Sequence, residues 1–229
     1  MDSNNIDFKR SILKANEILI SSTVINTFPF SITDLVKEIG KNKIDCCSFK
    51  RAAKYQYCGI QLQIQDFGSE SAILQDLIIG KNKFSIIFYN QNHLNTRIRF
   101  SIAHELGHHI LCHDKNNHEG YGKMEIETNF FAAQLLMPEQ IIWELIRRGI
   151  TINENKLVEL FNVSKEAAKK RIETLRKRDQ RFMTLEEKEQ NDIILLKYKS
   201  FLDNIKPVYQ NTNWYDDEYE MQKEREKWF

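Results

Sequence analysis

The pentapeptide His104-Glu105-Leu106-Gly107-His108 constrains this chain more than any other segment. Residues four apart lie on one face of an α-helix, one turn apart, so both imidazoles of this HExxH segment can reach a single metal ion. Apolar residues at helical spacing surround the segment and predict a largely buried helix from Arg97 to about Cys112. A buried histidine without a partner costs free energy, and a metal ion supplies that partner. The sequence therefore predicts a metal site rather than two solvated histidines on an exposed helix.

The chemistry of this site follows from the number of ligands. Zinc takes about four tetrahedral ligands in proteins, and a catalytic zinc keeps one position for water. His104 and His108 supply two ligands, so a third protein ligand has to come from another segment. Glu105 lies beside the pair and can act as general base on a water whose pKa zinc lowers toward about 7. We therefore expect one Zn²⁺ per chain.

The residues before this helix predict two helices followed by a small sheet. The first forty residues have the pattern helix, turn, helix, and the second helix ends at Gly40. Over 60–65 apolar residues alternate with glutamines, which predicts a half-buried strand. Apolar runs at 77–79 and 84–89 flank a turn that folds them into a hairpin. We expect these strands to form an antiparallel sheet.

Beyond Asn95 the sequence predicts helices almost to its end. A polar loop over 113–122 separates the HExxH helix from a second helix that runs from Lys123 to Met137. Pro138 then opens a third helix, closed by Gly149. One further helix is expected from Leu185 to about Leu202, before an acidic and aromatic end.

Residues 157–175 have the pattern helix, tight turn, helix, and Asn162 tolerates the left-handed turn position. Eight basic residues and three acidic residues lie between Lys165 and Arg181. This composition suits a helix-turn-helix that contacts DNA phosphates through Lys165, Lys169 and Lys170. The alternative is a helical pair that packs on the rest of the protein with a solvated basic face. We favour this alternative because only one short basic helix is present.

Composition limits the class of protein further. Hydrophobic residues make up 41% and charged residues 28%, which is a globular composition, and the formal net charge of +1 excludes a protein that coats polyanions. No apolar run approaches the roughly 20 residues that span a bilayer, and the N-terminus lacks the hydrophobic region of a secretory signal. Four cysteines without a CxxC spacing are typical of a reduced compartment. We expect a cytoplasmic protein without a membrane partner.

Two blocks of the sequence resemble a known family. The segment RFSIAHELGH, at 99–108, is similar to the RFxxAHELGH signature of the ImmA/IrrE-type zinc metallopeptidases. The segment EIETNFFAAQLLMP, at 125–138, is similar to their ExxANxFAAxLLMP block, with Thr128 where alanine is usual. The resemblance implies an α+β, zincin-like metallopeptidase fold. Such a fold would have a small antiparallel sheet and the HExxH helix, followed here by an all-helical extension with the helix-turn-helix-like pair.

The resemblance also implies where the third zinc ligand lies. In zincins with a glutamate ligand on the following helix, an Asp or Asn one turn later commonly supports a zinc-bound histidine. Glu125 and Asn129 are four apart and share a helix face, which makes Glu125 the ligand and Asn129 the partner that fixes an imidazole tautomer. Glu127 points about 200° away around the helix, so both glutamates cannot bind one ion. We favour Glu125.

Other residues near the motif have less specific roles. The family often has a histidine four residues after the second zinc histidine, where this chain has Cys112. We expect Cys112 to be a small core residue, because a fourth protein ligand would leave no position for water. His109, His113 and His118 are expected to be solvated. Tyr121, in the loop, is a candidate donor to a tetrahedral oxyanion.

Two expectations concern the surroundings of the motif helix. In zincins generally, the strand before this helix pairs with an extended substrate, a role that 84–89 would take unless it is an interior strand. Gly107, inside a buried helix, lets another backbone come close, which justifies its cost in helix propensity.

These observations predict a zinc metallopeptidase domain at 1–150, a helix-turn-helix-like segment at 151–180, and a helical, acidic-aromatic extension at 181–229. The resemblance implies a narrow protein substrate, a helix-turn-helix transcriptional repressor of a mobile element or a stress regulon. The alternative is a non-proteolytic regulatory protein of the same family, a stress-response regulator or an antitoxin-like partner, that acts by binding DNA or another protein.

Overall fold

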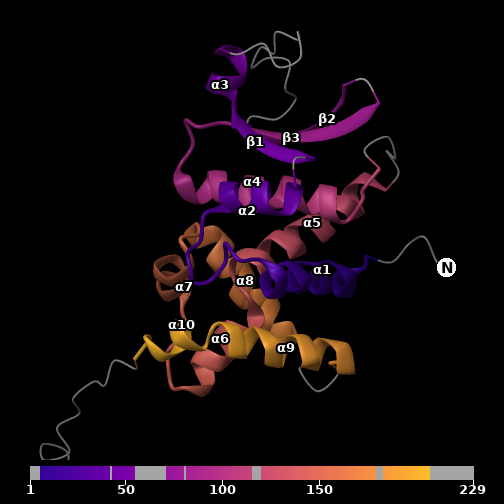
Figure 1. Ribbon diagram of the computed structural model, residues 1–229. Coiled ribbons are helices and arrows are strands. Elements are labelled where there is room, and N and C mark those ends of the chain that lie inside the picture. Colours follow the sequence, from indigo (N-terminus) through magenta and orange to yellow (C-terminus); the bar gives the residue numbers. More distant parts are fainter. Residues whose placement is uncertain are drawn as a thin grey trace, which may run out of the picture.

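In the computed structural model a small sheet covers one end of a helical body (Figure 1). The structure describes residues 6–41, 43–54, 71–79, 81–114, 120–178 and 183–206. Helices α2 (Ile32–Gly40) and α4 (Asn95–Ile110) lie directly beneath the sheet. The HExxH segment is therefore on a helix that packs against the sheet.

The sheet has three strands in the order β1-β3-β2, which are β1 (Ile44–Ser48), β2 (Ala72–Ile79) and β3 (Asn82–Tyr89). Strands β2 and β3 form the predicted antiparallel hairpin, with Leu74 opposite Ile87. Strand β1 pairs with β3 in parallel, so the expectation of a purely antiparallel sheet is wrong and the sheet is mixed. The physical reason is the connection: β1 leaves the sheet through α3 (Phe49–Lys54), and a long connection rather than a hairpin turn permits parallel neighbours. The strand predicted over 60–65 lies outside the described residues.

The helices after the sheet follow the predicted order with shifted bounds. The helix expected to start at Lys123 begins two residues earlier, so Tyr121 lies in its first turn and not in the preceding loop. The single helix expected from Leu185 is divided at Tyr198 into two. The helices of this part of the chain are α5 (Tyr121–Leu136), α6 (Glu139–Arg147), α7 (Glu154–Phe161), α8 (Lys165–Lys177), α9 (Leu185–Lys197) and α10 (Lys199–Asp203).

Helices α4 and α5 approach each other closely at Gly107. A Cβ atom at this position would lie 2.9 Å from Cδ1 of Phe131 and 3.3 Å from Cγ2 of Thr128. The close neighbours of Gly107 are thus two side chains of α5, and not a backbone as expected. Because any larger residue would push these helices apart, Gly107 helps to set the distance between the two halves of the candidate site.

The larger of the two hydrophobic core clusters among the described residues extends from Ala15 in α1 (Phe8–Ser21) to Leu202 in α10. Helix α9 lies beside α1 and closes its C-terminal end, where Lys197 Nζ donates hydrogen bonds to the carbonyls of Leu19 and Ser22, each at 2.6 Å. These carbonyls have no partner within their own helix, and a lysine there also interacts favourably with the helix dipole. Within the described stretches, no helix has the length and apolar character needed to cross a membrane.

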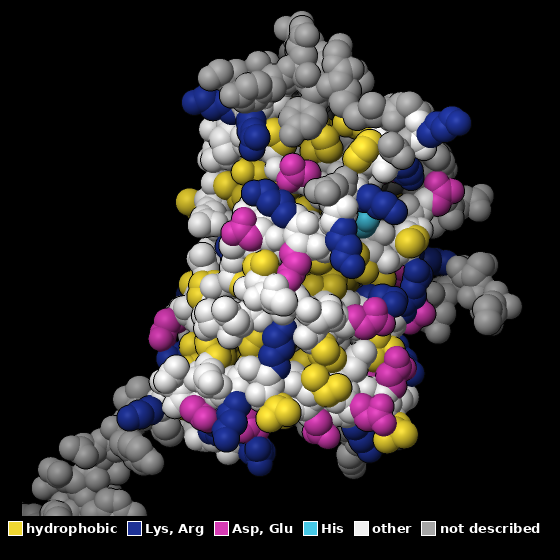
Figure 2. All heavy atoms as spheres, viewed as in Figure 1, with side chains coloured by type: hydrophobic (Ala, Val, Ile, Leu, Met, Phe, Trp, Pro, Cys, Tyr) yellow, Lys and Arg dark blue, Asp and Glu magenta, His cyan; other side chains and the backbone are white. Residues whose placement is uncertain are grey.

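Helices α7 and α8 flank the tight turn predicted between them. Asn162 has a left-handed backbone conformation with φ 51°. Lys165, Lys169 and Lys170 of α8 are exposed to solvent. On the face shown in Figure 2, Lys and Arg side chains are interspersed with Asp and Glu. Contact of the α8 lysines with DNA stays a prediction.

Arg171, which follows Lys169 and Lys170 in α8, is buried and does not belong to this exposed surface. Its exposed fraction is 2%. Its Nε donates to the carbonyl of Met137 at 3.0 Å, and its Nη2 donates to Oε1 of Gln134. Burial lowers the pKa of Arg171 to about 10, and the nearby Glu139 opposes that shift. Arg171 therefore fastens α8 to the end of α5.

We expect Arg171→Leu to lower the free energy of unfolding by about 2–5 kcal/mol, because it removes a buried donor from the Met137 carbonyl and from Gln134 Oε1, and the positive charge beside Glu139. The matched control is Lys170→Leu, which removes the same charge from an exposed ion pair with Glu166 and should lower stability far less. Urea denaturation measures both values. Similar losses in the two variants would show that Arg171 does not hold α8 in this way.

Candidate metal centre

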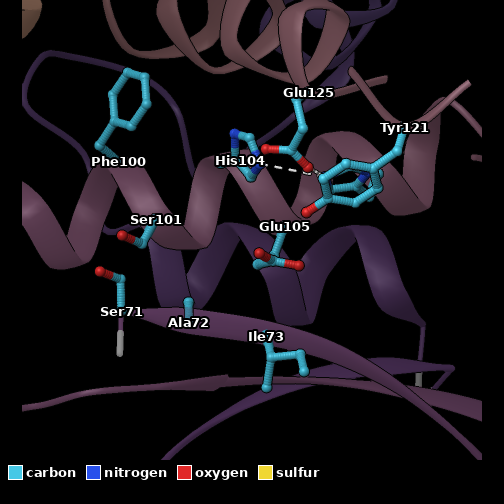
Figure 3. A pocket seen from close by; sticks show the side chains of 10 residues that line it. Ser71, Ala72, Ile73, Phe100, Ser101, His104, Glu105, Tyr121 and Glu125 are labelled. Atoms are coloured by element: carbon cyan, nitrogen blue, oxygen red, sulfur yellow. Dashed lines mark hydrogen bonds and ion pairs between the residues drawn. The ribbon is translucent and has the colours of Figure 1, made fainter. Parts of the chain in front are cut away.

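Three side chains meet between α4 and α5. His104, His108 and Glu125 each place a ligand atom within 4.8 Å of the others. The two imidazole Nε2 atoms are 3.2 Å apart. The Glu125 carboxylate bridges them, with Oε2 at 3.3 Å from His104 Nε2 and Oε1 at 3.1 Å from His108 Nε2. The structure thus brings together the three residues that were expected to bind the metal, and Figure 3 shows Glu125 reaching toward His104.

These separations suit a tetrahedral zinc ion. Nitrogen and oxygen atoms that bind zinc at about 2.0–2.1 Å in a tetrahedron lie about 3.3–3.4 Å from one another. In this structure the two Nε2 atoms are 3.2 Å apart, and each lies 3.1 to 3.3 Å from a different oxygen of the Glu125 carboxylate. Two imidazole nitrogens and one carboxylate also match the donor set of catalytic zinc sites, which have three protein ligands and one further position. The residues present therefore fit the metal.

The site has the charge that a cation requires. The hydrogen bond with His104 lowers the pKa of Glu125 to about 2, although burial opposes this shift. Burial tends to lower the pKa of His104, but its hydrogen bond with Glu125 and the charge of Glu105 outweigh burial, and its pKa is raised. Two carboxylates therefore make the space around the imidazoles favourable for positive charge.

His104 is oriented by the partner expected from the sequence. Its Nδ1 lies 3.1 Å from Oδ1 of Asn129, one helical turn after Glu125 on α5. An amide oxygen accepts the Nδ1 proton, which would leave the lone pair of Nε2 available to a metal ion in place of the proton that it shares with Glu125. Thr128, where the family has alanine, donates its hydroxyl proton to the carbonyls of its own helix.

His108 is oriented by two residues whose role was not expected. Its Nδ1 lies 3.1 Å from Nδ1 of His113, and His113 Nε2 lies 3.1 Å from Oε2 of Glu127. The His113 and Glu127 side chains are only 5% and 13% exposed. The expectation that His113 is solvated is therefore wrong. Burial lowers the pKa of His113, although Glu127 opposes this shift.

The other residues singled out in the sequence lie outside the group of three ligands. Cys112 is exposed, so the expectation of a core residue is wrong, and its backbone is left-handed with φ 53°. This conformation turns the chain back and brings His113 to His108. His109 is partly buried, and burial lowers its pKa. His118 lies outside the described residues.

Glu105 points from α4 toward the sheet. Its Oε2 accepts a hydrogen bond from the backbone N–H of Leu74 in β2, at 2.9 Å. It lines a cavity of about 480 Å³ together with the three ligand residues and Tyr121. In Figure 3 Glu105 lies beside the ligands, on the side that faces Ile73. The Glu105 side chain is thus held by a strand as well as by its own helix.

The strand next to this cavity is β2, and not the expected segment 84–89. That segment is β3, which pairs with β1 on one side and β2 on the other, so its backbone groups are committed to the sheet. In the described part of the chain β2 is an edge strand, and its residues Ala72 and Ile73 line the cavity. The alternative, that 84–89 is an interior strand, is therefore confirmed, because β1 pairs with its other side.

Tyr121 lies at the entrance to this cavity. Its side chain is 55% exposed, and its hydroxyl group forms a hydrogen bond with Glu125 that helps to lower the pKa of that carboxylate. In Figure 3 the hydroxyl group points into the site, toward Glu105. Its position agrees with that of a donor to reacting oxygen, and the oxyanion role stays a prediction.

The mixed α+β fold, with two histidines and a glutamate converging beside a second glutamate, is compatible with a zincin-like domain. Comparison with family models gives a match to the IrrE N-terminal-like domain, peptidase family M78, over residues 56–173. This match covers about half of the chain and includes α4 and α5, so the protein belongs to this family. A search of curated proteins gave no significant match.

Proposed function

We propose that the protein is a zinc-dependent endopeptidase whose substrate is a helix-turn-helix transcriptional repressor of a mobile element or a stress regulon. The observation that carries the hydrolytic part is the convergence of His104, His108 and Glu125, with Glu105 on the same cavity. Membership of the IrrE N-terminal-like family supports the choice of a peptide bond as the substrate. A repressor substrate places the proposed reaction in the cytoplasm.

In this proposal His104, His108 and Glu125 hold one zinc ion. Bound there, Zn²⁺ would polarise the scissile carbonyl and make a water molecule acidic near neutral pH. Glu105 takes a proton from the attacking water on its carboxylate as the water oxygen bonds to the carbonyl carbon. Glu105 then returns the proton to the amide nitrogen as the C–N bond breaks. The Leu74 N–H keeps the Glu105 carboxylate oriented for both steps.

The substrate segment would lie between β2 and the ligands. An extended peptide can add to an edge strand through backbone hydrogen bonds, and β2 has that place beside the cavity. The Tyr121 hydroxyl, at the cavity entrance, would donate to the oxyanion that forms on the carbonyl oxygen. Phe100 lines the same cavity and gives it an apolar wall.

A second role is supported by the exposed lysines of α8. Lys165, Lys169 and Lys170 could contact DNA phosphates in a non-proteolytic regulator of the same family. Lys170 already pairs with Glu166 at 2.9 Å, and Lys165 lies 4.0 Å from Glu154, so part of this positive charge is compensated within the protein. These ion pairs make DNA binding the weaker of the two proposals.

The experiment that tests the proposal is co-expression with a candidate helix-turn-helix repressor from the same genome. We expect a discrete repressor fragment. When the two purified proteins are mixed, a chelator should prevent formation of this fragment, and added Zn²⁺ should restore it. The control is His104→Gln, which removes a proposed ligand and should give no fragment. An intact repressor in the presence of zinc-loaded protein, with its target genes nevertheless released, would favour the non-proteolytic role.

A further inference from the structure

We propose that His113 and Glu127 form a hydrogen-bonded relay that holds His108 in the tautomer needed to bind a metal ion, an inference that rests on the proposed zinc site. Glu127 is the acidic end of the relay, His113 is its middle member, and His108 is the ligand. Both outer members are positioning residues, because they act on the metal through His108 alone.

The contacts define a continuous path from a carboxylate to the ligand. Glu127 Oε2 is 3.1 Å from His113 Nε2, and His113 Nδ1 is 3.1 Å from His108 Nδ1. The three side chains are at most 13% exposed, so solvent competes little for these hydrogen bonds. The second carboxylate oxygen, Glu127 Oε1, accepts the backbone N–H of Asp7 at 2.8 Å. Both Glu127 oxygens are therefore acceptors in defined hydrogen bonds.

The Glu127 carboxylate determines which ring nitrogen of each histidine carries the proton. An ionised carboxylate only accepts, so His113 carries its proton on Nε2. A neutral imidazole then has its lone pair on Nδ1, and this atom accepts the proton on His108 Nδ1. His108 Nε2 is left with its lone pair, and this is the atom that lies 3.1 Å from Glu125 and 3.2 Å from His104 Nε2. The relay thus selects the metal-binding tautomer.

The local backbone explains how His113 reaches this position. The Cys112 N–H donates to the His109 carbonyl at 3.2 Å, and the His113 N–H donates to the His108 carbonyl at 3.1 Å. With Cys112 left-handed, this is the Schellman arrangement at a helix C-terminus, which places the residue after the turn beside the residue five positions earlier. An apolar contact usually accompanies this motif, and here two imidazoles replace it.

Helix α1 holds the acidic end of the relay and the end of α4 together. Arg10 Nη2 donates to the carbonyl of Leu111 at 2.7 Å, and the Asp7 N–H, just before the helix, donates to Glu127. The relay therefore joins three segments that are distant in sequence. Such convergence on a ligand atom is typical of the outer partners of metal-binding histidines.

The test compares two substitutions of His113, one that keeps a hydrogen-bond acceptor and one that keeps the packed volume. His113→Asn can keep an acceptor near the position of Nδ1, whereas His113→Phe fills the volume better and has no acceptor. We expect His113→Phe to weaken zinc binding by about 10–100-fold, and His113→Asn to retain more of the affinity. Chelator competition measures the Kd, and the visible spectrum of the Co²⁺-substituted protein reports the coordination. The matched control is His93→Phe, which lies in the turn before α4 and should keep the wild-type Kd.

Glu127→Gln tests the relay without changing the shape of its acidic end. Glutamine has one acceptor oxygen and an NH₂ group. If the oxygen accepts the Asp7 N–H, the NH₂ group donates to His113 Nε2, and the proton order reverses along the relay. His108 would then carry a proton on Nε2, so zinc affinity should fall although every side chain keeps its size. If His113→Phe does not fold, the zinc affinity of Glu127→Gln still tests the relay.

Each outcome separates the relay from the metal site. Wild-type zinc and cobalt affinity in both His113→Phe and Glu127→Gln would overturn the relay and leave the zinc site intact. Equal losses in His113→Phe and His113→Asn, with unfolding shifted to the same extent, would assign His113 a packing role and also overturn it. A wild-type protein that binds neither metal would overturn the proposed zinc site and the relay together.

Discussion

Glu105→Gln is expected to lower the rate of repressor cleavage by about 10²–10⁴-fold, the usual contribution of a general base, while zinc content stays at the wild-type level. The amide oxygen of glutamine can still accept the hydrogen bond from the Leu74 N–H, so the side chain keeps its place on the cavity. What glutamine cannot do is take a proton from water. The loss should therefore appear in kcat, with little change in binding.

The measurement is the rate of fragment formation by purified protein at saturating zinc, together with the zinc stoichiometry of each variant. Ser101→Ala is a suitable control, because Ser101 lines the same cavity and has no assigned step in the reaction. An unchanged release of the regulated genes by Glu105→Gln would favour the non-proteolytic role. Loss of zinc from this variant would show instead that Glu105 helps to hold the metal.

Glu125→Ala is expected to weaken zinc binding by more than the roughly 10–100-fold that loss of an outer partner costs, because it removes one of three ligands. The remaining pair, His104 and His108, keeps its geometry on α4 but lacks the anionic donor between the two Nε2 atoms. Chelator competition on the apoprotein, reloaded with zinc, gives the affinity.

The comparison with Glu127→Ala distinguishes the two glutamates of α5. The Glu127 carboxylate binds His113 and the Asp7 N–H. Its removal should therefore weaken zinc binding only by the roughly 10–100-fold that loss of an outer partner costs. A severe loss in Glu127→Ala together with wild-type affinity in Glu125→Ala would show that the ligand assignment is wrong. Far-UV circular dichroism checks that both variants remain folded.

The grouping of the candidate metal ligands was predictable because it depends on helical spacing within α4 and α5 and on the family resemblance. His104 and His108 share a face of one helix, and Glu125 and Asn129 share a face of the next. In each case a separation of four residues fixes the relation between the side chains. The close approach of α4 and α5 at Gly107 then brings the two pairs together. The resemblance and these two spacings were enough to predict the four residues.

The parts that were missed depend on contacts between distant segments. Strand β1 is five residues long and lacks a regular alternation, and its parallel pairing with β3 becomes visible only in three dimensions. The role of His113 depends on a left-handed Cys112, a conformation that a cysteine seldom adopts and that no residue pattern indicates. Arg171 looks like its lysine neighbours in the sequence, and only the packing of α8 on α5 distinguishes it.

The lysine at the end of α9 determines how far this protein can be shortened. The family match ends at residue 173, yet Lys197 and Tyr198 donate to backbone carbonyls at the C-terminal end of α1. Asp7, the residue that caps the N-terminus of α1, in turn supplies the backbone N–H that binds Glu127. A truncated protein that stops at the family boundary would lose these donors and uncover one side of α1. We therefore expect the smallest stable form of this protein to retain α1 together with α9 and Tyr198.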